Sequence, residues 1–440
     1  MRPHVSWADL RSGPVGVWGV GVEGRATLRK LRALGIEPSV VVDGDPPGAP
    51  VEGAPVQAAD AAGLGALAAC TFVVKSPGIS RHGDDARTVA AGGARLVGGL
   101  GLWLEEADGA RVACVTGTKG KSTTASIAGA LAERLGTSCL VAGNIGVPPF
   151  DPDAPTDVDR WIIETSSFQA ADVSRSPEVV VVTALFEDHL DWHGDLDTYV
   201  ADKLSVCSQP GARVTVANGD DPRLAEHRDQ LGPEVVWVQL PEDPPAWLAG
   251  LGLVGRHNLR NALLAQRALV ELGVPGADDP AALADAAAGF VGLESRLQPL
   301  GSIGGVRFVD DGLATNVLPT TAALAAFAGD RVALLVGGYD RGVDYAPLAE
   351  AVGAFTGELL VLTLPDNGDR IAAALRAADL PASVEVRAVA DLDAGVAAGY
   401  AWARPGGLVL LSPAAPSFGR FRDYRDRSRA FRTAMGRCAE

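Results

Sequence analysis

Short apolar runs alternate with longer segments of mixed polar and apolar character along most of this chain. The runs are near-continuous rather than alternating, as expected of strands that are buried on both faces of a parallel sheet. They cover residues 15–20, 38–42, 72–75, 112–116, 161–163, 179–185, 306–309, 332–336, 359–363 and 408–411. The pattern predicts an α/β fold with mainly parallel sheets that are covered by helices.

Two polar, glycine-containing stretches near residues 105–110 and 296–305 interrupt this pattern and are interpreted as linkers. A chain of 440 residues also exceeds what one hydrophobic core usually fills. We therefore expect three domains, at residues 1–107, 108–296 and 297–440. The first and third are expected to be Rossmann-like, and the second to be a P-loop ATPase-like parallel-sheet domain. Residues 218–245 are acidic and proline-bearing, and are predicted to form a mobile loop.

The segment that starts at Val112 has the sequence VACVTGTKGKST, in which an apolar strand leads into a glycine loop, two lysines and hydroxyl residues. A helical stretch follows it, so backbone N–H groups and a positive helix end would face a polyphosphate. Lys121 would neutralise the outer phosphates, and Ser122 or Thr123 would hold Mg²⁺. The standard P-loop places its first glycine where Val115 stands, and a chance surface loop is the alternative, but the strand–loop–helix context favours ATP or GTP.

Lysine is rare in this chain: only five of the 38 basic residues are lysines. Two of the five, Lys119 and Lys121, lie in the predicted phosphate loop. Arginine and lysine are not interchangeable where a compact ammonium or a primary amine is needed. The remaining three are Lys203, which lies in a predicted helix, and Lys30 and Lys75, which are interpreted as ordinary surface residues.

A G-x-G-x-x-G pattern, formed by Gly19, Gly21 and Gly24, follows the first apolar run, and Asp43 lies about 20 residues further on. The pattern fits a dinucleotide site, but a nucleoside-diphosphate site uses the same helix-end physics and is the favoured interpretation. A second strand ends in the turn that starts at Ser76.

Two candidate metal ligands stand at strand ends beside the phosphate loop, where ligands of parallel sheets gather. Glu164 ends one strand, and His189 follows the next, preceded by Asp188. Both residue types suit Mg²⁺ or a positioned water. His193 is interpreted as a packing or orienting residue.

Charge and composition exclude several classes of protein. The formal net charge of −16 argues against a nucleic-acid or membrane-surface binder, which needs a basic face. The five scattered cysteines fit free thiols in a reducing compartment. No export signal or membrane span is evident, so we expect a cytoplasmic protein.

Several motifs in order along the chain resemble those of the Mur ligases, the ATP-dependent enzymes that build the peptidoglycan stem peptide. They are Gly117 to Thr123, Gly143-Asn144-Ile145-Gly146, Glu164 to Gln169, Asp188 to Asp191, Lys203, Gly255 to Ala262, Arg296 and Ser412-Pro413-Ala414. The resemblance spans almost the whole chain. It implies a three-domain enzyme that binds a UDP-sugar, ATP with Mg²⁺, and an amino acid, and that forms an amide bond through an acyl phosphate.

The resemblance also implies roles for individual residues. The implied ATP-binding residues are Gly117, Thr118, Lys119, Gly120, Lys121, Ser122, Thr123, Asn258, Asn261, Arg296 and Asp311. The implied metal ligands are Ser122, Glu164, His189 and a carbamylated Lys203. The implied catalytic residues are Lys121, Glu164, His189 and Lys203. The implied UDP-substrate residues are Gly19, Gly21, Gly24, Ser76, Asn144, Ser166 and Gln169. The implied glutamate-binding residues are Thr315, Arg341, Ser417 and Tyr424.

Within the family the chain most resembles the branch that adds glutamate to UDP-N-acetylmuramoyl-L-alanine. Its departures from the D-glutamate enzymes favour L-glutamate, with D-glutamate as the alternative: Leu313 stands where those enzymes have a lysine, and Ser295 where a histidine is usual. In the L-glutamate branch a separate epimerase later inverts the residue.

Three other interpretations are weighed against this one. Folate polyglutamylation would share the ATP loop but would not need the glycine-rich N-terminal domain. A nucleotide-gated binding protein and an NAD-dependent oxidoreductase are the alternatives from other classes. A dehydrogenase would not need Lys121 with Glu164 and His189, which is the feature that separates the hypotheses.

Overall fold

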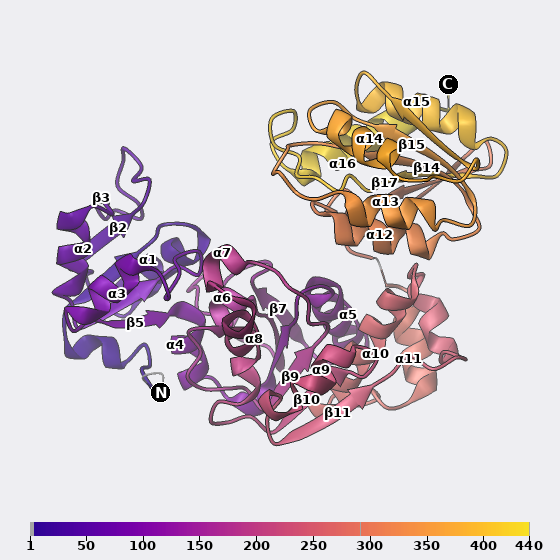
Figure 1. The fold of residues 1–440 in the computed structure, drawn as a ribbon. Coiled ribbons are helices and arrows are strands. Elements are labelled where there is room, and N and C mark those ends of the chain that lie inside the picture. Colours follow the sequence, from indigo (N-terminus) through magenta and orange to yellow (C-terminus); the bar gives the residue numbers. More distant parts are fainter. Residues whose placement is uncertain (1–3, 291, 440) are drawn as a thin grey trace. The chain divides into compact units, whose positions relative to one another are not determined.

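The computed structural model describes residues 4–290 and 292–439, and its chain divides into two compact units (Figure 1). The first unit comprises residues 4–250 with Arg260–Phe290, and the second comprises Leu251–Leu259 with residues 292–439. The first unit contains two parallel sheets and the second contains one mixed sheet. The α/β fold predicted from the apolar runs is therefore confirmed.

The N-terminal sheet has the strand order β3-β2-β1-β4-β5, and all of its strand pairs are parallel. Its strands and helices are η1 (Asp9–Ser12), β1 (Val15–Trp18), α1 (Val22–Ala33), β2 (Val40–Asp43), β3 (Gln57–Ala58), α2 (Ala61–Ala68), β4 (Phe72–Lys75), α3 (Asp84–Ala91), β5 (Arg95–Gly98), α4 (Gly99–Glu106) and η2 (Gly109–Arg111). Along the chain, β2 and β3 are added on one side of β1, and β4 and β5 are added on the other side, so the strand order reverses between β1 and β4. The carboxyl ends of these two strands therefore flank the crevice in which such sheets bind ligands.

The central sheet has the order β11-β10-β9-β6-β8-β7 and is also parallel throughout. Its elements are β6 (Val112–Thr116), α5 (Lys121–Arg134), β7 (Cys139–Gly143), β8 (Arg160–Glu164), α6 (Ser167–Ala170), β9 (Val179–Val182), α7 (Leu190–His193), α8 (Leu196–Leu204), η3 (Ser205–Cys207), β10 (Val214–Asn218), α9 (Pro222–Glu226), η4 (Arg228–Gln230), β11 (Glu234–Val238), η5 (Ala246–Leu251), α10 (Arg256–Glu271) and α11 (Pro280–Ala287). Because β6 lies between β8 and β9, the loops after these three strands meet at one edge.

The third sheet has the order β12-β13-β17-β14-β15-β16 and is mixed, because β12 pairs antiparallel with β13. Its elements are β12 (Gln298–Ile303), β13 (Val306–Asp310), α12 (Val317–Ala326), β14 (Arg331–Val336), α13 (Ala346–Gly353), β15 (Glu358–Thr363), α14 (Gly368–Ala377), β16 (Val384–Ala388), α15 (Leu392–Ala403), β17 (Leu408–Leu411) and α16 (Tyr424–Arg437). Helices α12 and α13 cover one face and α15 the other (Figure 1). Separate hydrophobic clusters line the two faces, as the near-continuous apolar strands require.

Three expectations from the sequence are wrong. Residues 298–303 of the predicted linker form strand β12, whose polar edge position hides it from an apolar-run criterion. Residues 218–245 are not a single loop, since they include α9 and the edge strand β11. Lys75 is not a surface residue, because its side chain is fully buried in an ion pair with Asp172.

Within the part of the chain that the structure describes, no helix combines the length and the apolar character that a bilayer crossing requires. All five cysteines are free in the structure, and none is bonded to another.

Candidate nucleotide and amide-forming site

The loop between β6 and α5 is held open by two glycines with positive φ. Gly117 has φ +129°, and a Cβ there would collide with Thr183 and with the backbone nitrogen of Ala184. Gly120 has φ +92°, and a Cβ there would lie 2.7 Å from Oδ1 of Asn261. Only glycine fits both the backbone conformation and the space. The loop is therefore shaped for close approach of a ligand to its backbone.

Hydrogen bonds to the segment that follows β9 and to helix α8 fix this loop. Thr118 Oγ1 donates to the carbonyl of Phe186 at 3.0 Å and lies 2.6 Å from the hydroxyl of Tyr199. Thr183 Oγ1 donates to the carbonyl of Lys119 at 2.6 Å. The loop is thus anchored on β9 and α8, which keeps its backbone N–H groups in a fixed arrangement.

Three of the five lysines converge on this loop. Lys121 Nζ donates to the carbonyl of Gly117 at 2.9 Å, and Lys203 Nζ donates to the same carbonyl at 3.1 Å. Lys119 Nζ lies 3.2 Å from a carboxylate oxygen of Asp188. Burial, followed by the neighbouring Lys121, holds the pKa of Lys203 well below its usual value. The loop therefore gathers positive charge where a polyphosphate would bind.

Glu164 ends β8 and is almost fully buried beside the phosphate loop. Its Oε1 accepts a hydrogen bond of 2.7 Å from the side-chain amide of Asn144, whereas its Oε2 is buried and has no hydrogen-bond partner among the described residues. An unsatisfied buried carboxylate oxygen is costly, and a cation would satisfy it. Glu164 and the Ser122 hydroxyl both offer oxygen atoms, the ligands that Mg²⁺ prefers, so these residue types fit this ion.

His189 caps α7 in a left-handed conformation with φ 55°. Its ring packs against Phe168 with centroids 4.8 Å apart, and half of its side chain is exposed. Burial lowers the pKa of His189 despite the nearby Asp188 carboxylate. A neutral imidazole at the rim of the loop can act as a ligand or position a water. His193, in contrast, is buried and hydrogen-bonded at both ring nitrogens, which fits the orienting role expected for it.

The N-terminal crevice lies between the loops after β1 and β4, as the glycine pattern predicts. Ser76 Oγ donates to the carbonyl of Gly19 at 3.1 Å. A Cβ on Gly24 would collide with that same carbonyl, whereas a Cβ on Gly21 would meet nothing within 4 Å. Asp43 accepts from the backbone nitrogens of Val20 and Asp45 at 2.7 and 2.9 Å. In an NAD site the corresponding acid binds a ribose hydroxyl, so this arrangement weighs against the oxidoreductase interpretation.

Two of the expected substrate residues, Ser166 and Gln169, form a capping box at the start of α6. Gln169 also donates to the carboxyl of Glu23 at 2.5 Å, which connects the central block to the N-terminal crevice. Burial raises the pKa of Glu23 to about 7, although Gln169 and Lys75 act in the opposite direction. Glu23 was not a candidate from sequence. Its place inside the G-x-G-x-x-G pattern was the available signal.

In the second unit, the loops after β13, β14 and β17 meet at one edge of the sheet. Ser412 Oγ donates to Asp311 at 2.7 Å, and the backbone nitrogen of Leu297 donates to the same carboxyl at 3.1 Å. Burial raises the pKa of Asp311 to about 7. The expected nucleotide residues Asn258, Arg296 and Asp311 all belong to this unit, and their role remains a prediction.

The four expected glutamate-binding residues are distributed unevenly. Thr315 and Arg341 are exposed, Tyr424 is partly buried at the start of α16, and Ser417 is buried after β17. The guanidinium of Arg341 lies 5.9 Å from the ring centre of Phe418.

Three residues of this edge escaped the sequence analysis. Phe418 and Tyr339 are exposed aromatics in a T-shaped contact, with ring centroids 6.4 Å apart. Arg427 is buried in α16, where it donates to the carbonyls of Gly312 and Ala415 at 2.8 and 3.0 Å. It therefore ties together the loops after β13 and β17. Its place in a run of exposed arginines gave no signal of this role.

Comparison with known proteins places these features in a family. Residues 115–243 match the Mur ligase middle domain, and residues 295–415 match the Mur ligase, glutamate ligase domain. A protein of Micromonospora sp. named UDP-N-acetylmuramoyl-L-alanine–L-glutamate ligase is 41% identical, with 97% of each chain covered. A protein of the same name from Xanthomonas euvesicatoria is 39% identical, over 98% of this chain and 96% of its own.

Solved structures agree on the fold. The MurF ligase of Thermotoga maritima, crystallised with ADP, matches with a TM-score of 0.59 at 14% identity, covering 97% of this chain and 95% of its own. The UDP-N-acetylmuramate-alanine ligase of the same organism matches with a TM-score of 0.57 at 18% identity, covering 97% and 99%. A folylpolyglutamate synthase of Mycobacterium tuberculosis also matches, with a TM-score of 0.55 at 14% identity, but only 76% of this chain is covered, against 93% of its own. Because relatives about 40% identical match over nearly the full length, this chain belongs to the Mur ligase family.

Proposed function

We propose that this chain joins L-glutamate to UDP-N-acetylmuramoyl-L-alanine, with ATP as the energy source, in the synthesis of peptidoglycan precursors. The observation that carries the proposal is the phosphate loop in which Lys121 and Lys203 meet at the carbonyl of Gly117, beside the buried, unsatisfied Oε2 of Glu164. The full-length similarity to proteins named for this reaction supports the choice of substrates.

In the proposed reaction, ATP phosphorylates the carboxylate of the muramoyl-alanine substrate. The amine of glutamate attacks the resulting acyl phosphate, and phosphate leaves as the amide forms. Lys121 and the loop N–H groups would hold the ATP phosphates. Positive charge is needed here because a carboxylate and a polyphosphate repel one another at close range.

Ser122 and Glu164 are the side chains that would hold one Mg²⁺ ion, and His189 would hold a second. When bound, Mg²⁺ supplies charge neutralisation between the phosphates and the reacting carboxylate. The hydrogen bond of Asn144 to Oε1 of Glu164 orients this carboxylate and leaves Oε2 for the ion. The loop anchors Thr118 and Thr183 keep the backbone fixed, so that little reorganisation is required as charge develops.

Lys203 is proposed to be carbamylated, as the family resemblance implies. Its amine would combine with CO₂ to give a carbamate and a proton, so a cation becomes a metal-binding anion. The burial of Lys203 near Lys119 and Lys121 supports this proposal, because a buried ammonium at this position would repel these two cations.

The crevice formed by Gly19, Gly24 and Ser76 is the proposed UDP subsite, and Gly21 opens the loop toward it. Asn144, Ser166 and Gln169 would lie near the muramoyl-alanine end. Asn258, Asn261, Arg296 and Asp311 are proposed for the nucleotide. Thr315, Arg341, Ser417 and Tyr424 are proposed for glutamate.

The proposed domain boundaries remain 1–107, 108–296 and 297–440. A cytoplasmic location is proposed together with this role. A separate epimerase would act on the product.

The experiment that tests the proposal measures phosphate release with each substrate omitted in turn. Release that requires both UDP-N-acetylmuramoyl-L-alanine and L-glutamate is the expected result. Phosphate release that is independent of both substrates would contradict the ligase proposal and would indicate a regulatory ATPase. A preference for D-glutamate, confirmed by the stereochemistry of the product, would contradict the assigned stereochemistry while leaving the ligase intact.

A further inference from the structure

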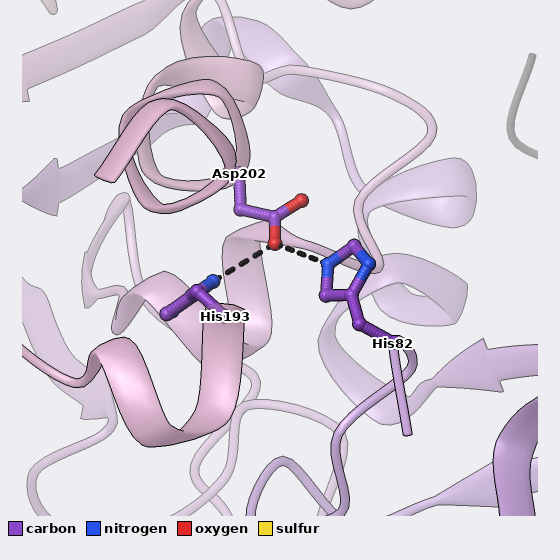
Figure 2. Close-up of side chains that lie close together, drawn as sticks. All are labelled: His82, His193 and Asp202. Atoms are coloured by element: carbon purple, nitrogen blue, oxygen red, sulfur yellow. Dashed lines mark hydrogen bonds and ion pairs between the residues drawn. The ribbon is translucent and has the colours of Figure 1, made fainter. Parts of the chain in front are cut away.

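A second group of potential metal ligands lies outside the nucleotide site. His82 follows β4, His193 ends α7, and Asp202 lies on α8, so three separate segments contribute (Figure 2). Their candidate ligand atoms all lie within 4.8 Å of one another. His82 Nε2 is 2.7 Å and His193 Nδ1 is 2.9 Å from the same oxygen, Oδ2, of Asp202.

We propose that His82, His193 and Asp202 form a binding site for a divalent transition ion of the Zn²⁺ type, which is distinct from the magnesium site. Two imidazoles and a carboxylate are ligands that such ions prefer, whereas Mg²⁺ favours sites in which most of the ligands are oxygen atoms. Three protein ligands leave a fourth position for water. About a third of the His82 side chain is exposed, which gives an ion a route to the site.

The hydrogen bonds around His193 suit this role. Its Nε2 lies 3.0 Å from Oγ of Ser167, a group that can either donate or accept. Without metal, Nδ1 carries the proton toward Asp202 and Nε2 accepts from Ser167. With metal at Nδ1, the proton moves to Nε2 and is donated to Ser167. The exchange needs no new partner, and ligating histidines commonly place their second nitrogen in this way.

The backbone segments that carry the ligands are also held together. Ser80 Oγ donates to the carbonyl of Trp192 at 2.6 Å, and Trp192 Nε1 donates to the carbonyl of Pro77 at 3.1 Å. These bonds join the segment before His82 to the helix of His193. The three ligands are therefore held close to the positions that a bound ion requires, so little ordering of the backbone is needed for binding.

An ion at this site would link the N-terminal block to helix α8. Asp202 precedes Lys203, whose Nζ contacts the phosphate loop through Gly117. Binding would therefore stabilise the folded first unit by mass action and would restrain the helix that carries Lys203. The metal-free alternative is a hydrogen-bonded His–Asp–His network that takes up no ion.

Co²⁺ replaces Zn²⁺ in such sites and gives visible absorption that reports its coordination, so it is the probe. The full chain without a histidine tag is titrated with Co²⁺ in excess Mg²⁺, and Zn²⁺ is then added. We expect one equivalent of Co²⁺ to give the absorption of four-coordinate ligation and Zn²⁺ to displace it. Absence of saturable binding would overturn the proposal.

Variants locate the site. His82→Gln removes a partly exposed ligand and should abolish the absorption, while His227→Gln, at a partly buried histidine outside the group, should leave it unchanged. Ser167→Ala should weaken binding by about 10–100-fold, as loss of an outer-shell partner does. Zn²⁺ should raise the melting temperature of the parent and of His227→Gln but not of His82→Gln. Binding that survives His82→Gln, or that is lost instead in His189→Gln, would also overturn the proposal.

Discussion

The phosphate-loop edge of the first unit and the loop edge of the second unit use their charged groups in opposite ways. Around the phosphate loop, lysines meet carbonyl oxygens, and Glu164 keeps a buried oxygen without a partner. In the second unit, the Asp311 carboxyl and the two terminal nitrogens of Arg427 are bonded to hydroxyl, amide or carbonyl groups of their own unit, while Nε of Arg427 is buried and has no hydrogen-bond partner among the described residues. A bound ligand would therefore satisfy the charged groups of the first edge, whereas most charged groups of the second edge hold its loops in place.

The largest effect is expected at Lys203. Lys203→Ala should abolish ligation, because it removes a proposed metal ligand from the centre of the charged loop. A short-chain carboxylate added to this variant should restore part of the activity by replacing the carbamate. Steady-state phosphate release with both substrates measures the loss and the rescue.

An amine-specific role would give a different pattern. In that case a small alkylamine, rather than a carboxylate, would restore activity. Carbon-13 NMR of the parent protein with labelled CO₂ should give a carbamate signal that Lys203→Ala lacks. Full activity in the alanine variant would remove Lys203 from the site altogether.

The next effect is expected at Lys121, which the phosphate loop holds through the carbonyl of Gly117. Lys121→Ala should lower turnover by about 10²–10³, which corresponds to roughly 2–4 kcal/mol of barrier. Its melting temperature should stay near that of the parent, since the side chain is only partly buried. Lys30→Ala, which changes a lysine of α1, is the control and should keep parental turnover. Equal losses in both variants would contradict a specific role for Lys121.

The two edges also differ in how far sequence could predict them. The phosphate loop was identifiable because glycines, lysines and hydroxyls follow a strand at fixed spacing, and strand order then brought Glu164 beside it. The proposed glutamate-binding edge depends on side chains from three loops whose approach is set by the sheet order. Strand β12 was missed because Gln298, Gly301 and Ser302 interrupt its apolar residues, and Lys75 was misplaced because burial of an ion pair leaves no local signature in the sequence.

Arg427 illustrates the remaining gap. A helix with many arginines predicts a solvated face, and only the packing of α16 against the loops after β13 and β17 reveals a buried guanidinium. Burial lowers its pKa to about 10. Similarly, Phe418 and Tyr339 become neighbours only when β14 and β17 pair.

A smaller effect is expected at Arg427. Arg427→Lys keeps the positive charge but cannot bond two carbonyls in the same fork, so the loops after β13 and β17 should loosen. Loss of one such bond should cost about 1–3 kcal/mol of unfolding free energy in the second unit. The Michaelis constant for glutamate should rise more than turnover falls, while that for ATP should change little. Arg429→Lys, at an exposed position of the same helix, is the matched control. Parallel changes for both substrates would indicate a general loss of structure instead.

The last prediction concerns pH, which affects stability rather than turnover and tests the buried carboxyl of Asp311. Burial raises the pKa of Asp311 from 3.8 to about 7, so the folded state keeps a proton that the unfolded chain loses. Its contribution to stability is complete below about pH 4 and is lost as the pH rises through about 7. Asp311→Asn removes this titration while keeping a group that can accept the hydrogen bonds of Ser412 and Leu297. Denaturant unfolding of the second unit should therefore depend less on pH in this variant than in the parent or in Asp369→Asn, whose side chain is exposed on α14. If the parent and Asp311→Asn lose stability equally between about pH 4 and about pH 7, the second edge does not hold a protonated carboxyl, and its contrast with the phosphate loop fails at this residue.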